Sequence, residues 1–212
     1  MIDYLREPVR LAGSTLKRSS HVCAFFHSHE EKYRVLMPFI KDGIENGDRS
    51  FHIVDPQLRA GHRSRLEQAG IDVAAAEAEG RLEVFPWQEV HVQDGRFDQF
   101  RMIELVKQAI ARQEPGEITR FVGNMEWALE DLPGVHDLLE YETRLNQFLP
   151  AHRDPVVCCY DISRFDAGTM IDIMRTHPMV IIGGILQENP FYVPPEAMLQ
   201  ELQERKAIGI AG

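Results

Sequence analysis

The sequence predicts one three-layer α/β domain, in which a mostly parallel sheet is joined by crossover helices. The chain has 212 residues, of which 44% are hydrophobic and 26% charged, and these values suit one domain with a sizeable core. Short apolar runs rich in β-branched residues alternate with longer segments of helical period. We expect strands at residues 22–26, 50–54, 82–85, 118–122, 156–160 and 180–182.

The first crossover carries the clearest helical stripe. Its apolar residues recur at the spacing of one helix face, and Asn46-Gly47 ends the pattern; they are Tyr33, Leu36, Met37, Ile40 and Ile44. Glycines and prolines bound the further helices, which we expect at residues 56–69, 97–113, 135–149, 167–176 and 196–205. We expect residues 1–20 to form an N-terminal extension and residues 21–212 to form the single domain.

Charge and composition narrow the range of partners and locations. The formal net charge of -10 comes from 33 acidic and 23 basic residues, so we expect no direct contact with nucleic acid. No run approaches the roughly 18 consecutive apolar residues of a membrane helix, and residues 1–20 do not resemble a signal peptide. The three cysteines do not form a disulfide framework. We therefore expect a cytoplasmic protein that does not bind membranes.

Polar residues and glycines follow the expected strands at their carboxyl ends, where open parallel sheets bind ligands. Each also has a structural explanation, because Asp often caps the next helix, glycine permits a turn and buried aromatic residues are usually core. Glu126 could alternatively pair with Arg120. The candidate ligand-binding residues are Phe25, His27, His29, Asp55, Glu126, Trp127, Asp161, Gly183 and Gly184.

The loop after the first strand lacks the chemistry of a phosphate-binding loop. Residues 27–32 read His-Ser-His-Glu-Glu-Lys, without the glycines of the GxxxxGK[ST] pattern that wrap phosphate oxygens. Glu30 and Glu31 would repel a triphosphate, and nothing aims Lys32 at one. We therefore expect no conventional ATP hydrolysis, no catalytic residue and no cofactor.

A metal interpretation of the same loop is weak. His27 and His29, with Cys23 nearby, are good transition-metal ligands by residue type. However, residues two apart in an extended segment point to opposite sides, and Cys23 is expected to face into the sheet. Neither HExxH nor GxSxG occurs in the chain. We therefore expect no metal site here.

Residues 188–195 predict a stiff aromatic flap, because their prolines limit the freedom of the backbone. We expect this flap to cover the strand-end site or to dock a partner protein. Its contact residues are Asn189, Pro190, Phe191 and Tyr192.

Several ordered segments together resemble the MEDS domain, the methanogen/methylotroph DcmR sensory domain. The resemblance extends from about residue 21 to about residue 204, so it covers nearly the whole chain. It implies a RecA/KaiC-like fold without a Walker A loop and a bacterial or archaeal module that senses small organic compounds, such as hydrocarbon derivatives. The matching segments are residues 21–26, 38–47, 51–55, 123–129, 141–146, 159–165, 175–178 and 188–195.

The resemblance favours a non-catalytic sensory domain that binds a small-molecule ligand and acts through a histidine kinase or a transcription regulator. Two alternatives stay open. One is a degenerate nucleotide-binding protein or weak ATPase of the KaiC/RecA type. The other is a metal-dependent enzyme that uses His27, His29 and the strand-end carboxylates. These patterns are also compatible with a homo-oligomer.

Overall fold

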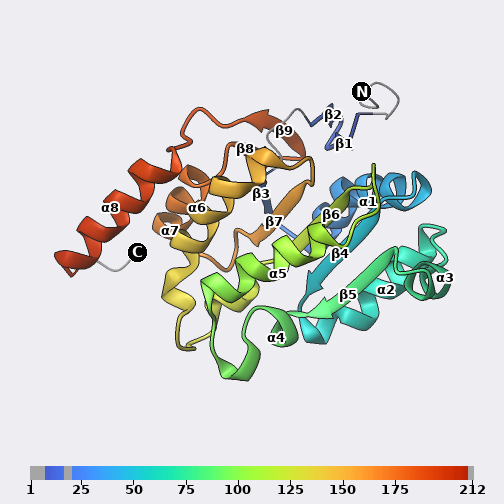
Figure 1. Ribbon diagram of the computed structural model, residues 1–212, viewed down its shortest axis with the longest axis horizontal. Coiled ribbons are helices and arrows are strands. Elements are labelled where there is room, and N and C mark those ends of the chain that lie inside the picture. Colours follow the sequence, from blue (N-terminus) through green and yellow to red (C-terminus); the bar gives the residue numbers. More distant parts are fainter. Residues whose placement is uncertain (1–7, 17–20, 210–212) are drawn as a thin grey trace.

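The computed structural model describes residues 8–16 and 21–209 (Figure 1). The main sheet has seven strands in the order β5-β4-β6-β7-β3-β8-β9. Every neighbouring pair is parallel except β8 and β9, so the predicted mostly parallel sheet is confirmed. The strands are β3 (His21–Phe26), β4 (Arg49–Val54), β5 (Leu82–Pro86), β6 (Thr119–Asn124), β7 (Val156–Asp161), β8 (Met179–Ile182) and β9 (Ile185–Glu188).

Helices lie on both sides of this sheet, as the three-layer prediction requires (Figure 1). Among the described residues, no helix is long and apolar enough to cross a bilayer. One side carries α1 (His29–Glu45), the short η1 (Pro56–Leu58), α2 (Arg59–Gln68) and α3 (Val73–Ala78). The other side carries α4 (Trp87–Val90), α5 (Gln99–Ala111), α6 (Leu138–Phe148), α7 (Ala167–Arg175) and α8 (Pro195–Ala207).

Three strands and the short helices α3 and α4 were not predicted from the sequence. Strand β9 lies at the edge of the sheet and buries only Leu186, so it lacks a recognisable apolar run. A small hairpin of β1 (Arg10–Leu11) and β2 (Ser14–Thr15) falls within the expected N-terminal extension. Leu11 of the hairpin and the adjacent Leu16 are buried in the core on the α1 side, so the described part of the extension packs onto the domain.

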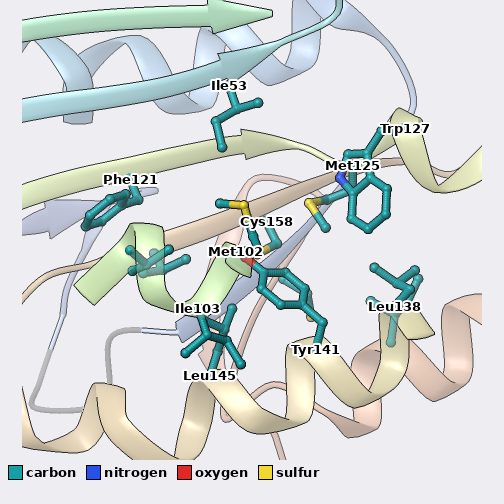
Figure 2. Close-up of a cluster of buried hydrophobic side chains, with 14 of the residues drawn as sticks. Ile53, Met102, Ile103, Phe121, Met125, Trp127, Leu138, Tyr141, Leu145 and Cys158 are labelled. Atoms are coloured by element: carbon teal, nitrogen blue, oxygen red, sulfur yellow. The ribbon is translucent and has the colours of Figure 1, made fainter. Parts of the chain in front are cut away.

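The sheet separates two apolar cores, because alternate residues of each strand face opposite sides. On β7, Cys158 faces the α5 and α6 side, whereas Val157 and Cys159 face the α1 side. Figure 2 shows Cys158 and Phe121 of the sheet meeting side chains of α5 and α6. This alternation lets a single strand contribute to two different sites.

Arg120 ties the amino-terminal part of β6 to the end of α1. Its Nε donates to Asp48 Oδ2 at 2.7 Å and its Nη2 donates to Asp42 Oδ2 at 2.9 Å. Gly43 leaves room for this side chain, since a Cβ at that position would lie 2.6 Å from Arg120. Arg120 is therefore engaged near the start of β6 and is not the partner of Glu126, which follows the end of that strand.

Candidate functional site

A narrow crevice lies at the carboxyl ends of β3, β6 and β7, where the parallel topology predicts a ligand site. We call it the strand-end crevice. Its enclosed volume is about 10 Å³, which is room for about one water molecule. It is lined by Phe26, Ser28, His29, Lys32, Glu126, Cys159, Tyr160 and Asp161.

A capping box closes the loop at the mouth of this crevice. Ser28 Oγ accepts a hydrogen bond from the Glu31 amide at 3.2 Å, and the His27 amide donates to Glu31 Oε2 at 2.8 Å. Glu30, in the same turn, pairs with Arg65 of α2. The chain's own carboxylates thus stand at the helix N-terminus, where a phosphate group would bind in an ATPase.

Lys32 and Glu126 are the two buried charged side chains of the crevice. Lys32 Nζ donates to Asn124 Oδ1 at 3.2 Å, at the end of β6. Glu126 begins the short helix η3 (Glu126–Leu129), and only 5% of it is exposed. Its Oε2 atom is buried and has no hydrogen-bond partner among the described residues. The crevice therefore offers an ammonium group and a free carboxylate oxygen to a small polar molecule.

Lys32 was not among the residues predicted to bind a ligand. Without a glycine loop, its charge had no obvious target in the sequence. The available signal was its spacing, since Lys32 lies four residues before Leu36 and eight before Ile40 on the buried face of α1. A lysine on that face must bring its ammonium group to a polar partner inside the fold.

The structure brings three of the predicted residues, His29, Glu126 and Asp161, to the strand-end crevice. Asp161 Oδ1 also accepts hydrogen bonds from the Ser163 amide and hydroxyl, at 2.9 and 2.6 Å. Asp55 caps η1 through the Gln57 amide and does not line the crevice. His27 is exposed and contributes its backbone amide to the capping box.

Phe25 and Trp127 belong to the core on the α5 and α6 side. Phe25 packs near Tyr160, with 6.0 Å between ring centroids. Trp127 is fully buried and stacks on His91 at 4.6 Å, with Phe97 at 4.3 Å. Both side chains are therefore core residues, as the structural explanation of these positions expects.

Gly183 and Gly184 form the turn between β8 and β9 rather than a wall of the crevice. Both have positive φ angles, which glycine adopts without strain. They line a separate groove between the N-terminal hairpin and α1, and a Cβ on Gly184 would lie 3.3 Å from Val35.

The predicted flap lies at the opposite edge of the sheet from the crevice. Strand β9 runs antiparallel to β8 and pairs Glu188 with Met179, which brings the chain back to the amino-terminal edge. There, Asn189 Nδ2 donates to the carbonyl oxygens of Met174 and His177, at 2.6 and 2.7 Å. The flap therefore does not cover the crevice, whereas Phe191, with 62% exposure, is accessible to a partner.

A second polar cluster lies inside the protein, between the sheet and α6. Its members are fully buried, and one donor atom from each lies within 4.8 Å of the others. Little in the sequence indicated this cluster, because its members come from separate elements. The only local signal was a histidine that alternates with Cys23 and Phe25 on the inward face of β3. The members are His21, Glu142, Cys158 and His177.

The sheet order, the helical layers and the crevice at the strand ends define a KaiC-like α/β domain. Among solved structures, the fold is similar to a KaiC-like protein of the hyperthermophilic archaeon Pyrococcus horikoshii, with a TM-score of 0.55 and 14% sequence identity. The similarity covers 80% of this chain and 73% of that protein. At this identity, the likeness establishes the fold alone.

The sequence itself matches the family described as MEthanogen/methylotroph, DcmR Sensory domain over residues 20–178. The chain belongs to this MEDS family. It is 26% identical over 170 residues to the transcriptional repressor DcmR of Methylorubrum extorquens. That similarity covers 79% of this chain and 62% of the repressor, so the chain spans less than two thirds of its relative. The family and this relative support a sensory or regulatory role.

Proposed function

We propose that this domain is a non-catalytic sensor that binds a small polar organic molecule in the strand-end crevice and acts through a partner regulator. The observation that carries the proposal is the buried Oε2 of Glu126, which lacks a hydrogen-bond partner among the described residues. Lys32 and Glu126 line the same crevice, and a buried polar atom without a partner costs about 1–3 kcal/mol. A ligand that satisfies this atom recovers that cost.

The charges of the crevice select the chemistry of the ligand. A hydroxyl group can donate to Glu126 Oε2 and accept from Lys32 Nζ, whereas an unsubstituted hydrocarbon can do neither. Phe26 and Cys159 supply apolar walls for a short carbon chain. Small hydroxylated or otherwise polar derivatives of hydrocarbons therefore suit this crevice best.

Binding of such a ligand requires the crevice to open, because its present volume is about 10 Å³. A ligand that binds the open arrangement more tightly than the closed one shifts the population toward the open arrangement. The size of this shift is set by the difference between its two affinities. Opening separates α1 from the loops after β6 and β7. This movement is the change that a partner regulator would detect.

A nucleotide suits the site less well. The Glu31 carboxylate accepts from the His27 amide and Ser28 Oγ accepts from the Glu31 amide, so side chains of the loop already hold these two amides. Glu126 and Asp161 add negative charge around the same opening. Bringing a triphosphate there would place its charge against these carboxylates. These features support a sensor over a KaiC-like ATPase, and they support the absence of catalysis by this crevice.

The test is a thermal-shift and calorimetric screen with short-chain alcohols, halogenated alkanes and ATP as probes. We expect a saturable stabilisation by a hydroxylated compound. We also expect Glu126→Gln and Lys32→Met to weaken binding at least about tenfold, which corresponds to about 1.4 kcal/mol. Asp55→Asn is the matched control, because Asp55 follows a neighbouring strand but lies outside the crevice.

Two results would contradict the proposal. One is binding of a small organic probe that both crevice variants retain at full strength. The other is micromolar binding of ATP together with no response to any small organic probe, which would favour the nucleotide-binding alternative.

A further inference from the structure

We propose that His21, Glu142, Cys158 and His177 form a buried binding site for a divalent transition-metal ion, with zinc as the best fit. The four residues come from β3, α6, β7 and the segment before β8, and all are buried. The site is separate from the strand-end crevice. It goes beyond the proposed sensing function and does not depend on it.

Four of the six distances between the donor atoms match a tetrahedral ion, and all six are within 4.8 Å. Glu142 Oε2 lies 3.1 Å from His21 Nε2 and 3.4 Å from His177 Nε2. Cys158 Sγ lies 3.5 Å from His21 Nε2 and 3.6 Å from Glu142 Oε2. Zinc bonds of about 2.0 Å to nitrogen and oxygen and about 2.3 Å to sulfur place tetrahedral donor atoms roughly 3.3–3.6 Å apart. One ion can therefore reach all four residues with little rearrangement.

The hydrogen bonds around His21 orient it as a metal ligand. Asn146 Nδ2 donates to the carbonyl oxygens of Glu142 and Thr176, at 3.2 and 2.6 Å. The other polar atom of this side chain, Oδ1, is therefore the carbonyl oxygen and can only accept a hydrogen bond. His21 Nδ1 lies 3.0 Å from that Asn146 Oδ1 and must carry the proton of the contact. The neutral ring then directs the lone pair of Nε2 toward the centre of the cluster.

His177 is oriented in the same way by the backbone. Its Nδ1 lies 2.8 Å from the carbonyl oxygen of Ile173, so Nδ1 carries the proton there. Its buried Nε2 has no hydrogen-bond partner among the described residues and lies 3.4 Å from Glu142 Oε2. Metal-bound histidines commonly donate their second ring N–H to a carbonyl or side-chain oxygen in this manner. Both imidazoles thus have their outer contacts satisfied, and their inner nitrogens face Glu142.

Without an ion, this arrangement is electrostatically costly. Two neutral imidazoles would direct lone pairs at a carboxylate, and two protonated rings would stand with their centroids only 4.1 Å apart. One protonated ring would pair with Glu142 and leave the lone pair of the other ring facing that carboxylate. A bound dication takes the place of protons on the two rings, neutralises the charge of the Glu142 carboxylate and stabilises the thiolate form of Cys158.

Zinc suits a closed site of two imidazoles, one carboxylate and one thiolate, because it accepts nitrogen, oxygen and sulfur donors in tetrahedral geometry. The site joins the sheet to α6 and to the turn that follows α7. Its role is then structural, since no open coordination position faces the surface. Binding of the ion contributes directly to the stability of the fold.

The experiment is elemental analysis of the untagged full chain, followed by removal of metal with a chelator and titration with Zn²⁺ and Co²⁺. We expect about one zinc ion per chain as purified. We also expect reconstitution with Co²⁺ to give the visible bands of a tetrahedral site and a near-ultraviolet thiolate-to-cobalt band. The thermal midpoint should fall on chelation and return on addition of Zn²⁺.

Two variants on one strand provide the matched comparison. Cys158→Ser should abolish the thiolate-to-cobalt band, whereas Cys159→Ser, on the opposite face of β7, should retain it. If Cys158→Ser does not fold, Glu142→Gln, which keeps the size of the side chain, takes its place, and lowered Co²⁺ affinity is the readout. The proposal is overturned if the folded wild-type chain neither carries zinc nor gives the cobalt spectrum. It is also overturned if Cys159→Ser, and not Cys158→Ser, removes the band.

Discussion

Tyr160 donates a hydrogen bond from its hydroxyl to Glu142 Oε1 at 2.6 Å. The adjacent Cys159 and Asp161 line the strand-end crevice, so consecutive residues of β7 serve the crevice and the buried cluster. The two sites are therefore joined by the backbone of a single strand. Any movement of β7 that opens the crevice also acts on the carboxylate of the cluster.

The three cysteines are expected to be unreactive in the native protein. All are buried as free thiols, and burial raises the pKa of Cys159 to about 12. Burial followed by the charge of Glu142 raises the pKa of Cys23 well above its usual value. Alkylation at pH 8 followed by mass spectrometry should label none of them before denaturation and all of them after it. Rapid labelling of Cys23 or Cys159 in folded protein would contradict this burial.

Acid should destabilise the fold through His52 and His62. His52 Nδ1 lies 3.0 Å from His62 Nε2 inside the protein, and burial lowers the pKa of His52 to about 4. Between about pH 6.5 and pH 4, the unfolded chain binds a proton at this residue and the folded chain does not. The contribution of His52 to the free energy of unfolding is therefore fully present above about pH 6.5. It falls as the pH is lowered, by up to about 3 kcal/mol.

Urea unfolding of wild type and His52→Gln at pH 7.5, 6, 5 and 4.5 measures this effect. The variant should lose part of the slope of unfolding free energy against pH, whatever its stability at neutral pH. His136→Gln is the control, since that histidine is exposed. An unchanged slope in His52→Gln would contradict the prediction.

Gly134 should tolerate no side chain. It has a φ of +87°, and a Cβ there would lie 2.1 Å from the carbonyl oxygen of Phe97. Gly80 has a similar φ of +69° but nothing within 4 Å. We expect Gly80→Ala to cost about 1–2 kcal/mol from the left-handed backbone alone, and Gly134→Ala to cost several kcal/mol more. Equal shifts of the thermal midpoint in the two variants would show that the contact with Phe97 relaxes freely.

Asn189 should control the order of the flap. Its side-chain amide is shared by the carbonyl oxygens of Met174 and His177, so Asn189→Ala leaves both without that donor. We expect a loss of about 2 kcal/mol and faster amide hydrogen exchange in residues 189–195, with little change in β4 or β5. Phe191→Ser is the control, because its exposed side chain should contribute little to stability. Uniformly faster exchange throughout the sheet would instead indicate global destabilisation.

The strand pattern was predictable because each buried parallel strand is a compact apolar run bounded by polar or turn residues. Edge strand β9 was not predicted because it buries only Leu186. The short helices α3 and α4 were not predicted because they have too few residues to show an apolar stripe. Among the site residues, Glu126 and Asp161 were predictable because Asp161 ends β7 and Glu126 lies two residues after the end of β6. Lys32 was not, because its target, Asn124, lies 92 residues away.

The sequence alone determined the alternation of strands and helices, the absence of a glycine phosphate loop after β3, and the resemblance that led to the MEDS family. These are local properties, set by side-chain type and spacing. The tertiary structure decided which polar groups meet: Lys32 with Asn124, the flap with His177, and Glu142 with His21 and Cys158. Such pairs depend on strand order and helix packing, because residues distant in the chain become neighbours only when the strands pair and the helices pack on the sheet.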